Sequence, residues 1–369
     1  MDRMAVWVLL IVETVIAGGL MLLVPKFTRR GLLFGVYVGD EHWQSDEARG
    51  ITRAWYLVMT SALVVSIVLG VVMTIAKPDA PIAAIGPLFL MLFASLGTYL
   101  WAHFRARGLA IAGAPISAAA LVSDPPGLLT IPLIALSIAM VAGALSVADA
   151  WMHYAAVPGR IPMHFGIGGL PDRWEPKTFW SVMLLPLMTM GMGALLGTMA
   201  CLTARAKRAL RQGDRGVSFA AQIRFRRAVS VFLSGTVVLV AVLLSSLSYG
   251  SLRVALGEAE RLPAVAMVGG ILLVIYAVGG SLVLMFRYGQ GGSRLEKAAE
   301  QAPLTNGLAD NAHWVLGAFY VNRDDPSLMV EKRFGIGYTL NFGNRKVVVA
   351  FAVLVVVILA RVVFALMGR

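Results

Sequence analysis

Charge and cysteine are both scarce in this sequence. Charged residues make up 14% of its 369 residues, whereas an ordinary soluble domain has about 25%, so much of the chain is not suited to contact with water. The single cysteine, Cys201, excludes an intrachain disulfide. The sequence also lacks a G-x-x-x-x-G-K-[ST] phosphate loop and a G-x-S-x-G nucleophile turn. These absences argue against a phosphate-loop enzyme and against a serine hydrolase.

Apolar residues are abundant instead, at 58% of the chain, and the mean hydropathy is +0.77. They form runs of about 20 residues, the length that crosses a hydrocarbon core of about 30 Å. Because backbone groups in lipid must bond internally, and the period-2 alternation of a barrel strand is missing, each run predicts a helix. The sequence therefore predicts an all-α polytopic membrane protein with about eight transmembrane helices: Met4–Val24, Trp55–Ile75, Ile82–Trp101, Leu129–Ala150, Phe179–Leu202, Ala228–Tyr249, Ala264–Phe286 and Val347–Leu366.

Lysine and arginine are distributed unevenly along this chain of net charge +12. Alternate loops, within residues 26–53, 105–107, 205–227 and 287–346, hold 23 of the 32 basic residues. The positive-inside rule places these loops in the cytoplasm, which predicts a membrane protein with its N-terminus and C-terminus outside. The basic loop of residues 203–227 is either a site for anionic lipid headgroups or a plain topology determinant. We expect no nucleic-acid partner, because no recognised binding fold accompanies the charge.

The expected regions follow from this map. They are an N-terminal membrane region with three spans, a two-span domain with an external motif loop, a basic cytoplasmic loop with two more spans, and a cytoplasmic module with the last span: residues 1–128, 129–202, 203–286 and 287–369.

Two stretches within these regions have patterns of their own. The Pro-interrupted stretch 108–127 is either a re-entrant segment or a loop packed on the bundle. Residues 335–344 alternate apolar and polar side chains between glycines, which predicts a short strand or hairpin in the cytoplasmic module. Residues 289–293, rich in glycine, predict a flexible exit from the bundle.

The motif loop, residues 161–177, is the densest source of binding chemistry. Its glycines and prolines predict a rigid, turn-rich structure. We expect the following side chains to bind a peptide or a lipid headgroup: His164, Asp172, Arg173, Trp174 and Lys177. The alternative is a structural clip that joins the fourth and fifth spans.

A metal site is a further alternative. Asp149 and His153 are four residues apart, so a continuing helix places them on one face, and His164 and Asp172 follow in the motif loop. Imidazole and carboxylate suit Zn or Mn, but no fixed metal-binding spacing occurs, so we favour neither a metal nor a cofactor.

Two charges lie inside predicted spans. Glu13 lies near the middle of the first span and Arg361 within the last. A carboxylate at that depth costs several kcal/mol unless it is paired, protonated or facing water. We therefore expect a Glu13–Arg361 pair, with a protonated Glu13 in a transport path as the alternative.

The motif loop resembles a known family. Residues 161–177 read I-P-x-H-F-x-x-x-G-x-P-D-R-W-x-x-K, which resembles the membrane domain of unknown function found in SdpI-like immunity proteins; Gly166 stands where that family has asparagine. Residues 29–38 and 320–343 resemble parts of larger bacterial membrane proteins that carry this domain. The second of these is similar to a cytoplasmic domain of unknown function with the patterns Y-x-N-x-x-D-P and G-x-T-x-N-F-G.

The resemblance implies a role in immunity or envelope stress, because the understood relatives protect cells from a secreted antimicrobial peptide and relay its presence. We expect a protein that is not an enzyme, binds a peptide or lipid group at the external loop, and contacts a cytoplasmic regulator through Asn322, Asp324, Asp325, Lys332, Arg333 and Asn341. The alternative is a membrane-embedded, metal-dependent enzyme or transporter that acts on a lipid-linked substrate.

Overall fold

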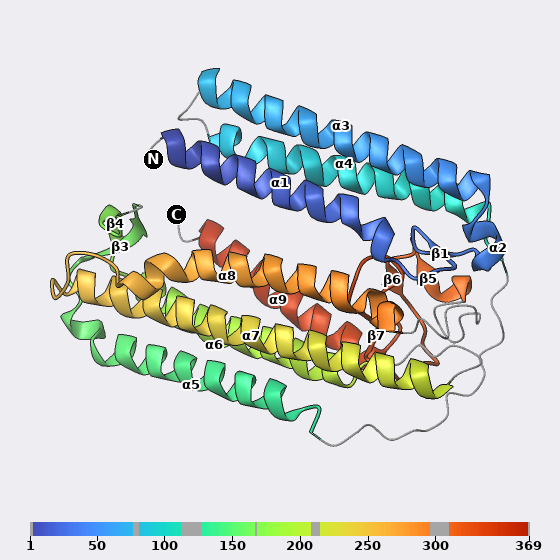
Figure 1. Cartoon of the computed structure of the whole chain (residues 1–369). Helices are drawn as coiled ribbons and strands as arrows, with labels where there is room; N and C mark the ends of the chain where they lie inside the picture. The colour runs from blue at the N-terminus through green and yellow to red at the C-terminus, as the bar shows by residue number, and fades with distance from the viewer. Residues whose placement is uncertain are drawn as a thin grey trace. The chain divides into compact units, whose positions relative to one another are not determined.

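The computed structural model describes residues 3–76, 81–111, 127–166, 168–207, 215–295 and 310–367. The described residues are mostly helical (Figure 1), with 71% of them in helices. The same residues form four two-stranded antiparallel sheets. Among the described residues, six helices are long and apolar enough to cross a membrane. They lie within α3 (Asp46–Ala76), α4 (Pro81–Arg107), α5 (Thr130–Met152), α6 (Phe179–Ala204), α7 (Arg215–Ala255) and α8 (Ala264–Val283) with the residues that follow it.

The protein is therefore a mostly helical, multipass membrane protein, as the apolar runs predict. Helices also form at the first and last predicted spans, as α1 (Arg3–Phe27) and α9 (Arg345–Met367). Their assignment as the remaining two spans stays a prediction.

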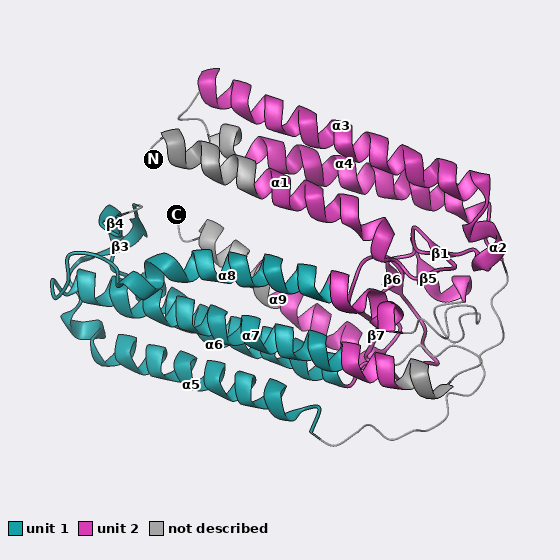
Figure 2. Cartoon of the chain, viewed as in Figure 1, with its two compact units in different colours: residues 1–2, 122–204, 226–284 teal, residues 3–121, 205–225, 285–369 magenta. Residues whose placement is uncertain are grey.

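The chain divides into two compact units (Figure 2). Unit 1 comprises the first two residues with residues 122–204 and 226–284, and unit 2 comprises residues 3–121, 205–225 and 285–369. The sequence divides the chain into four consecutive regions, whereas in the structure the N-terminal helices and the C-terminal module belong to one unit. Local composition cannot reveal this grouping, because it arises from contacts between segments about 300 residues apart, such as Arg29 with Glu331.

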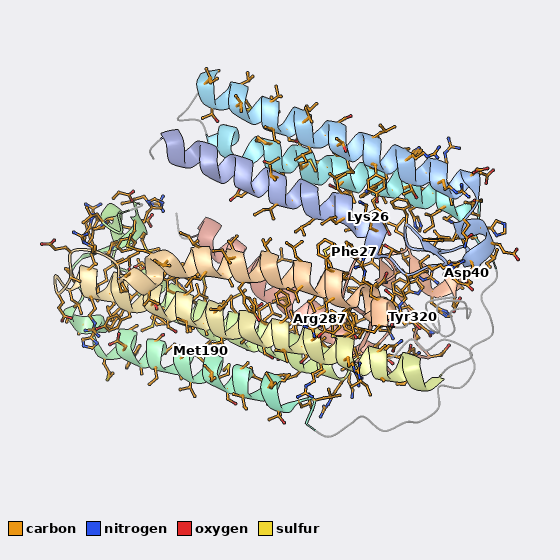
Figure 3. All side chains as sticks on the ribbon, in the orientation of Figure 1. Lys26, Phe27, Asp40, Met190, Arg287 and Tyr320 are labelled. Atoms are coloured by element: carbon orange, nitrogen blue, oxygen red, sulfur yellow. The ribbon has the colours of Figure 1, made fainter. Side chains whose placement is uncertain are left out.

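Small residues bring α5 and α6 of unit 1 close together. A side chain built on Gly193 would meet Ala139, and one on Gly197 would meet Leu136. In the other direction, a side chain built on Gly143 would meet Met190 of α6; Met190 is labelled in Figure 3. Since lipid supplies no hydrophobic force between helices, such close backbone approach is a main source of helix association in a membrane.

A hairpin joins α5 to α6. Its strands β3 (Arg160–Phe165) and β4 (Pro171–Pro176) pair antiparallel, with Ile161 opposite Glu175. The amide of Gly169 closes the turn on the carbonyl of Gly166 at 2.8 Å, and Gly169 has φ +74°, which glycine adopts without strain. The turn-rich motif loop is thus a β-hairpin, whose strands the sequence did not predict.

The turn and the base of the hairpin are each held by neighbouring residues of unit 1. The amide of Leu262, just before α8, donates to the carbonyl of Gly169 at 2.9 Å. At the start of α6, the Thr178 and Ser181 side chains accept from each other's backbone amides at 3.0 and 2.8 Å, as in a capping box. The hairpin therefore has a defined exit into α6.

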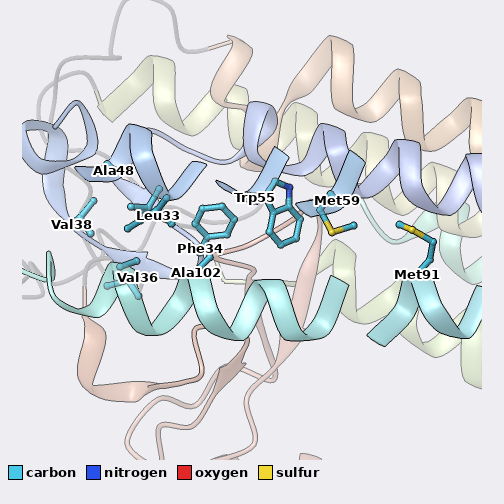
Figure 4. Close-up of a cluster of buried hydrophobic side chains, with 11 residues drawn as sticks. Leu33, Phe34, Val36, Val38, Ala48, Trp55, Met59, Met91 and Ala102 are labelled. Carbon is cyan, nitrogen blue, oxygen red and sulfur yellow. The ribbon is translucent and has the colours of Figure 1, made fainter. Parts of the chain in front are cut away.

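Unit 2 has an aromatic core around Trp55. Trp55 and Phe34 lie close together in this core (Figure 4), with their ring centroids 5.2 Å apart. The Trp55 ring also lies 5.8 Å from Phe334, and Trp55 is fully buried. Phe34 lies between strands β1 (Leu32–Leu33) and β2 (Val36–Tyr37), and Phe334 comes from the C-terminal part of the chain. The short helix α2 (Gly39–Trp43) follows β2. This core joins the segment after α1 to the C-terminal module.

The C-terminal module holds the other two sheets. Strands β5 (Trp314–Val315) and β6 (Phe319–Tyr320) form one pair, and β7 (Met329–Glu331) and β8 (Tyr338–Leu340) form the second. The strand predicted within residues 335–344 is β8. The glycine-rich residues 289–293 form an ordered turn rather than a flexible exit, because Gly291 and Gly292, at φ +57° and +84°, are buried among other groups of unit 2.

Several sequence expectations fall outside the described residues. Most of the stretch 108–127 and residues 208–214 of the basic loop lie there, as does the side chain of Arg361. Glu13 is exposed in α1. The expected Glu13–Arg361 pair therefore stays a prediction.

Candidate functional site

A cavity of about 330 Å³ lies between the hairpin and the adjoining helix ends of unit 1. Strand β3 forms one wall, the first turns of α6 a second, and the last turns of α7 a third. Its lining residues are Ala150, Ile161, Pro162, Met163, His164, Phe165, Ser181, Val182, Leu184, Leu185, Leu247, Ser248, Ser251, Leu252 and Leu262.

The lining is mostly apolar, with a few polar groups. Ser248 and Ser251 are buried on α7, and the Ser251 hydroxyl donates to the Pro162 carbonyl at 3.1 Å. Ser181 and His164 complete the polar side chains of the lining. Apolar walls with a few placed polar groups are typical of small-molecule and side-chain binding sites.

His164 forms a pair with Asp172 across the hairpin. The distance from His164 Nδ1 to Asp172 Oδ1 is 2.5 Å, and both side chains are more than half exposed. A ring that donates its Nδ1–H to the carboxylate has a fixed orientation and presents Nε2 as an acceptor when neutral. The pair can thus offer a polar contact beside the apolar cavity.

The other two residues of the metal alternative form a separate group. Asp149 Oδ1 lies 2.5 Å from Arg253 Nη2 and 3.1 Å from His153 Nδ1, and Arg253 also contacts Glu258 at 3.0 Å. Asp149 and His153 share a helix face, as their spacing predicts. Among the described residues, however, no three His, Cys, Asp or Glu side chains lie close enough together to hold a metal. The four residues of the alternative make two pairs, and Asp149 is already held by a guanidinium.

The remaining motif residues have different surroundings. Lys177 Nζ donates to the Val157 carbonyl at 2.8 Å and lies 4.7 Å from the Tyr154 ring centroid, so it fixes the base of the hairpin. Arg173 is exposed and lies 3.6 Å from Glu175, while Trp174 is half-buried. Of the predicted binding set, His164 lines the cavity, and Asp172 and Arg173 are exposed beside it.

The predicted partner-contact residues of the C-terminal module are mostly internal. Asn322, Asp325, Arg333 and Asn341 are buried, whereas Asp324 is exposed and Lys332 is half-buried. These burials indicate a scaffolding role for four of the six. Contact with a regulator stays a prediction for the exposed positions.

Asn341 shows that scaffolding role most clearly. Its Nδ2 donates to the carbonyls of Asn322 and Asp325 at 2.9 Å and of Ser327 at 3.2 Å. Its Oδ1 accepts from the amides of Asn322 and Gly343, both at 3.0 Å. One buried amide therefore holds together the loop between β6 and β7 and the residues that follow β8.

Charges in this module are strongly affected by burial. Burial alone would raise the pKa of Asp325, but hydrogen bonds from Lys207 Nζ, at 2.7 Å, and from the Ser327 amide, at 3.0 Å, hold it below its ordinary value. Burial lowers the pKa of Arg333 to about 9, and it lowers the pKa of Lys332 as well. Arg333 is stabilised by Asn311, at 2.7 Å, and by the Trp314 ring, 5.0 Å from its guanidinium carbon.

Several residues at or near the site have no motif that could have revealed them. Ser248 and Ser251 lie in an apolar run with no motif around them. Arg253 follows Tyr249 by four residues, the spacing at which its guanidinium stacks on that ring at 4.8 Å. In the sequence, only this spacing indicates that the arginine at the end of α7 is held in a fixed position.

Two family models match parts of the chain. A domain of unknown function (DUF1648) matches residues 140–190, which cover the end of α5, the hairpin and the first half of α6. A family of unknown function (DUF5808) matches residues 323–348. A search of curated proteins found no match, and a search of solved structures found none either. The chain is thus similar to two domains of unknown function, one in each unit.

Proposed function

We propose that this protein is a non-enzymatic protein of the bacterial cytoplasmic membrane, of immunity or envelope-stress type and similar to SdpI-like proteins. It has about eight spans and both termini outside. It binds an apolar side chain of an extracytoplasmic peptide in the cavity beside β3. The cavity of about 330 Å³ carries this proposal, because two of its three walls, β3 and the first turns of α6, come from the segment that matches the first family model.

The chemistry of the lining supports such a ligand. The volume falls at the lower end of the roughly 300–1,000 Å³ found for ligand sites, and apolar walls favour burial of an apolar group. The exposed His164–Asp172 pair and Arg173 lie beside it and can bind the polar backbone or charged groups of a peptide. A lipid group is the other occupant that the same walls accept.

A pair of methionine substitutions tests the proposal. Met163 lines the cavity, whereas Met152 lies at the end of α5 with 71% of its surface exposed and does not line it. We expect Met163→Trp to fill the cavity and to abolish tolerance of a secreted antimicrobial peptide in a deletion strain complemented with the variant. Met152→Trp should leave tolerance intact.

The result depends on equal amounts of both variants in the membrane, which an immunoblot checks. If Met163→Trp restores tolerance as well as the native protein does, the cavity is not the binding site. If the deletion strain shows no defect in tolerance or stress response, the immunity assignment itself fails.

The enzymatic alternative has less support. It needs Asp149, His153, His164 and Asp172 to act together, whereas Asp149 is bound to Arg253 and the two histidines have separate carboxylate partners.

The proposed function also includes a cytoplasmic regulator. It would contact the exposed Arg323 and Asp324 of the C-terminal module.

A further inference from the structure

A second cavity, of about 390 Å³, lies in unit 2 where α1 ends and α3 begins. It is separate from the site beside the hairpin. Of its lining residues, only Phe334 lies in a segment that a family model matches. Its walls come from the end of α1, from β1 with Phe34, from α2 and from the first turns of α3.

The cavity has an apolar floor and a basic, hydroxyl-bearing rim. Leu32, Leu33 and Phe34 of the floor are buried and come from the β1–β2 segment. The rim is one stripe of α3, because Arg49, Thr52, Arg53 and Tyr56 follow the i, i+3, i+4, i+7 spacing of a helix face. An amphiphilic cavity of this kind calls for an amphiphilic ligand.

The two rim arginines differ in how far they are already bound. Arg49 donates to the Gln44 carbonyl at 2.8 and 3.1 Å and lies 3.6 Å from the fully exposed Asp46 carboxylate. Arg53 is exposed and makes no hydrogen bond or ion pair within the described part of the chain. Arg53 is therefore the cation available to an anionic group, and Arg49 adds positive charge beside it.

Position along the helix specifies the source of that anion. α3 is a candidate membrane span, and Arg49 and Arg53 lie in its first turns, just before its apolar stretch. Tyr56 and Trp43 line the same cavity, and such aromatic side chains concentrate at the headgroup level of a membrane. A soluble phosphate ion would pair with the arginines but would make no apolar contact with the floor of the cavity.

We propose that this cavity binds one anionic phospholipid. The phosphate contacts Arg53 and Arg49, and the glycerol and the upper part of an acyl chain lie over Leu32, Leu33 and Phe34. Arginine suits this role, since its planar guanidinium binds phosphate through two parallel hydrogen bonds. The inference does not rest on the function proposed for the hairpin.

Short-chain lipids added to the purified full-length protein test this site. Native mass spectrometry should show one molecule of dioctanoyl phosphatidylglycerol bound specifically to each protein molecule. Dioctanoyl phosphatidylcholine should bind more weakly. Arg53→Gln should weaken phosphatidylglycerol binding about tenfold, and Arg49→Gln/Arg53→Gln further. Arg105→Gln is the matched control, because Arg105 is an exposed arginine of the same unit that does not line the cavity, and it should bind as the native protein does.

A charge-neutral variant separates the lipid from a simple ion effect. Thr52→Trp fills the cavity from the rim and keeps both arginines, so it should also reduce phosphatidylglycerol binding. Undiminished binding in the double arginine variant, or equal binding of the zwitterionic lipid, would overturn the proposal. Displacement of the lipid by millimolar glycerol 3-phosphate or inorganic phosphate would overturn it too, because it would show a soluble-anion site.

Discussion

At the scale of single residues, buried polar side chains hold the C-terminal module together. Asn341 is fully buried and satisfies five backbone partners. Arg29 and Glu331 form an ion pair at 2.9 Å with almost no exposed surface. A buried pair of this kind costs desolvation, and breaking it leaves an uncompensated charge. The module is therefore stable only when the distant segments that carry these residues associate correctly.

The Asp325 carboxylate makes the stability of the module depend on pH. Its folded pKa lies below the ordinary value of 3.8, so its stabilising effect is complete above pH 3.8 and is lost as the pH falls through the folded pKa. We expect Asp325→Asn to destabilise the protein by roughly 2 kcal/mol at neutral pH, a typical value for hydrogen bonds to a charged group.

Apparent Tm values of the native protein and the Asn variant, measured from neutral pH down to about pH 2, check this expectation. The gap between the two should narrow as the pH falls below 3.8. A gap that stays constant over the whole range would show that the charge of Asp325 does not contribute. Asp324→Asn is the control, since that neighbouring side chain is exposed.

At the scale of elements, the contact between α5 and α6 depends on the absence of side chains. A Cβ on Gly193 would lie 2.9 Å from the Cβ of Ala139, whereas a Cβ on Gly191 would meet nothing within 4 Å. We expect Gly193→Leu to force the helices apart and to destabilise the protein by about 1–3 kcal/mol, as overpacking of a close contact does.

Gly191→Leu provides the matched comparison for this element. It makes the same change in the same helix, two residues away, at a position with open space, and should leave the apparent Tm in detergent nearly unchanged. Equal losses in the two variants would mean that helix propensity or detergent contact, rather than the α5–α6 interface, sets the effect.

The hairpin owes its position to contacts at both its turn and its base. The carbonyl of Gly169 accepts a hydrogen bond from the amide of Leu262, two residues before α8, and Lys177 binds the Val157 carbonyl at the base. Such anchoring makes β3 a firm wall for the cavity. A rigid wall favours binding, because a segment that is already ordered loses little conformational entropy when the ligand binds.

At the scale of the whole molecule, the proposals depend on how the chain is oriented in the membrane. We expect Leu170, 52% exposed in the turn of the hairpin, to face the outside, and Asp324, exposed in the C-terminal module, to face the cytoplasm. In a Cys201→Ser background, a membrane-impermeant maleimide should label Leu170→Cys in intact cells. It should label Asp324→Cys only after the cells are opened.

The opposite labelling pattern would reverse the assignment of the basic loops and would remove the extracytoplasmic ligand from the proposed function. Labelling of both positions in intact cells would mean that the hairpin and the C-terminal module lie on the same side, which an even number of crossings between them would produce.

Much of the helical architecture could be predicted from the sequence. Long apolar runs predicted the six candidate spans of the described chain, because the need to bond the backbone internally in lipid leaves one simple solution. The strand at Tyr338–Leu340 was predicted from its alternation, but the strands of the hairpin were not. Strands β3 and β4 do not alternate regularly between apolar and polar residues, and prolines stand within β3 and at both ends of β4, so their sequence predicts turns instead.

The candidate site could be predicted only in part. His164 and Asp172 were identified from the chemistry of the motif, and their position beside a cavity depends on the register of β3 with β4. Ser248, Ser251 and Arg253 come from α7, about 80 residues further along the chain, and nothing in their local sequence indicates the hairpin.

The sequence by itself determined the environment of this protein, since hydropathy and charge act through each residue's own transfer energy and need no knowledge of neighbours. Only the tertiary structure decided which segments share a core, which asparagines and arginines are buried and hold neighbouring segments together, and where the two cavities lie. Those properties arise from contacts between residues far apart in the chain. Packing and hydrogen bonding act over a few ångströms in space, whatever the separation in sequence.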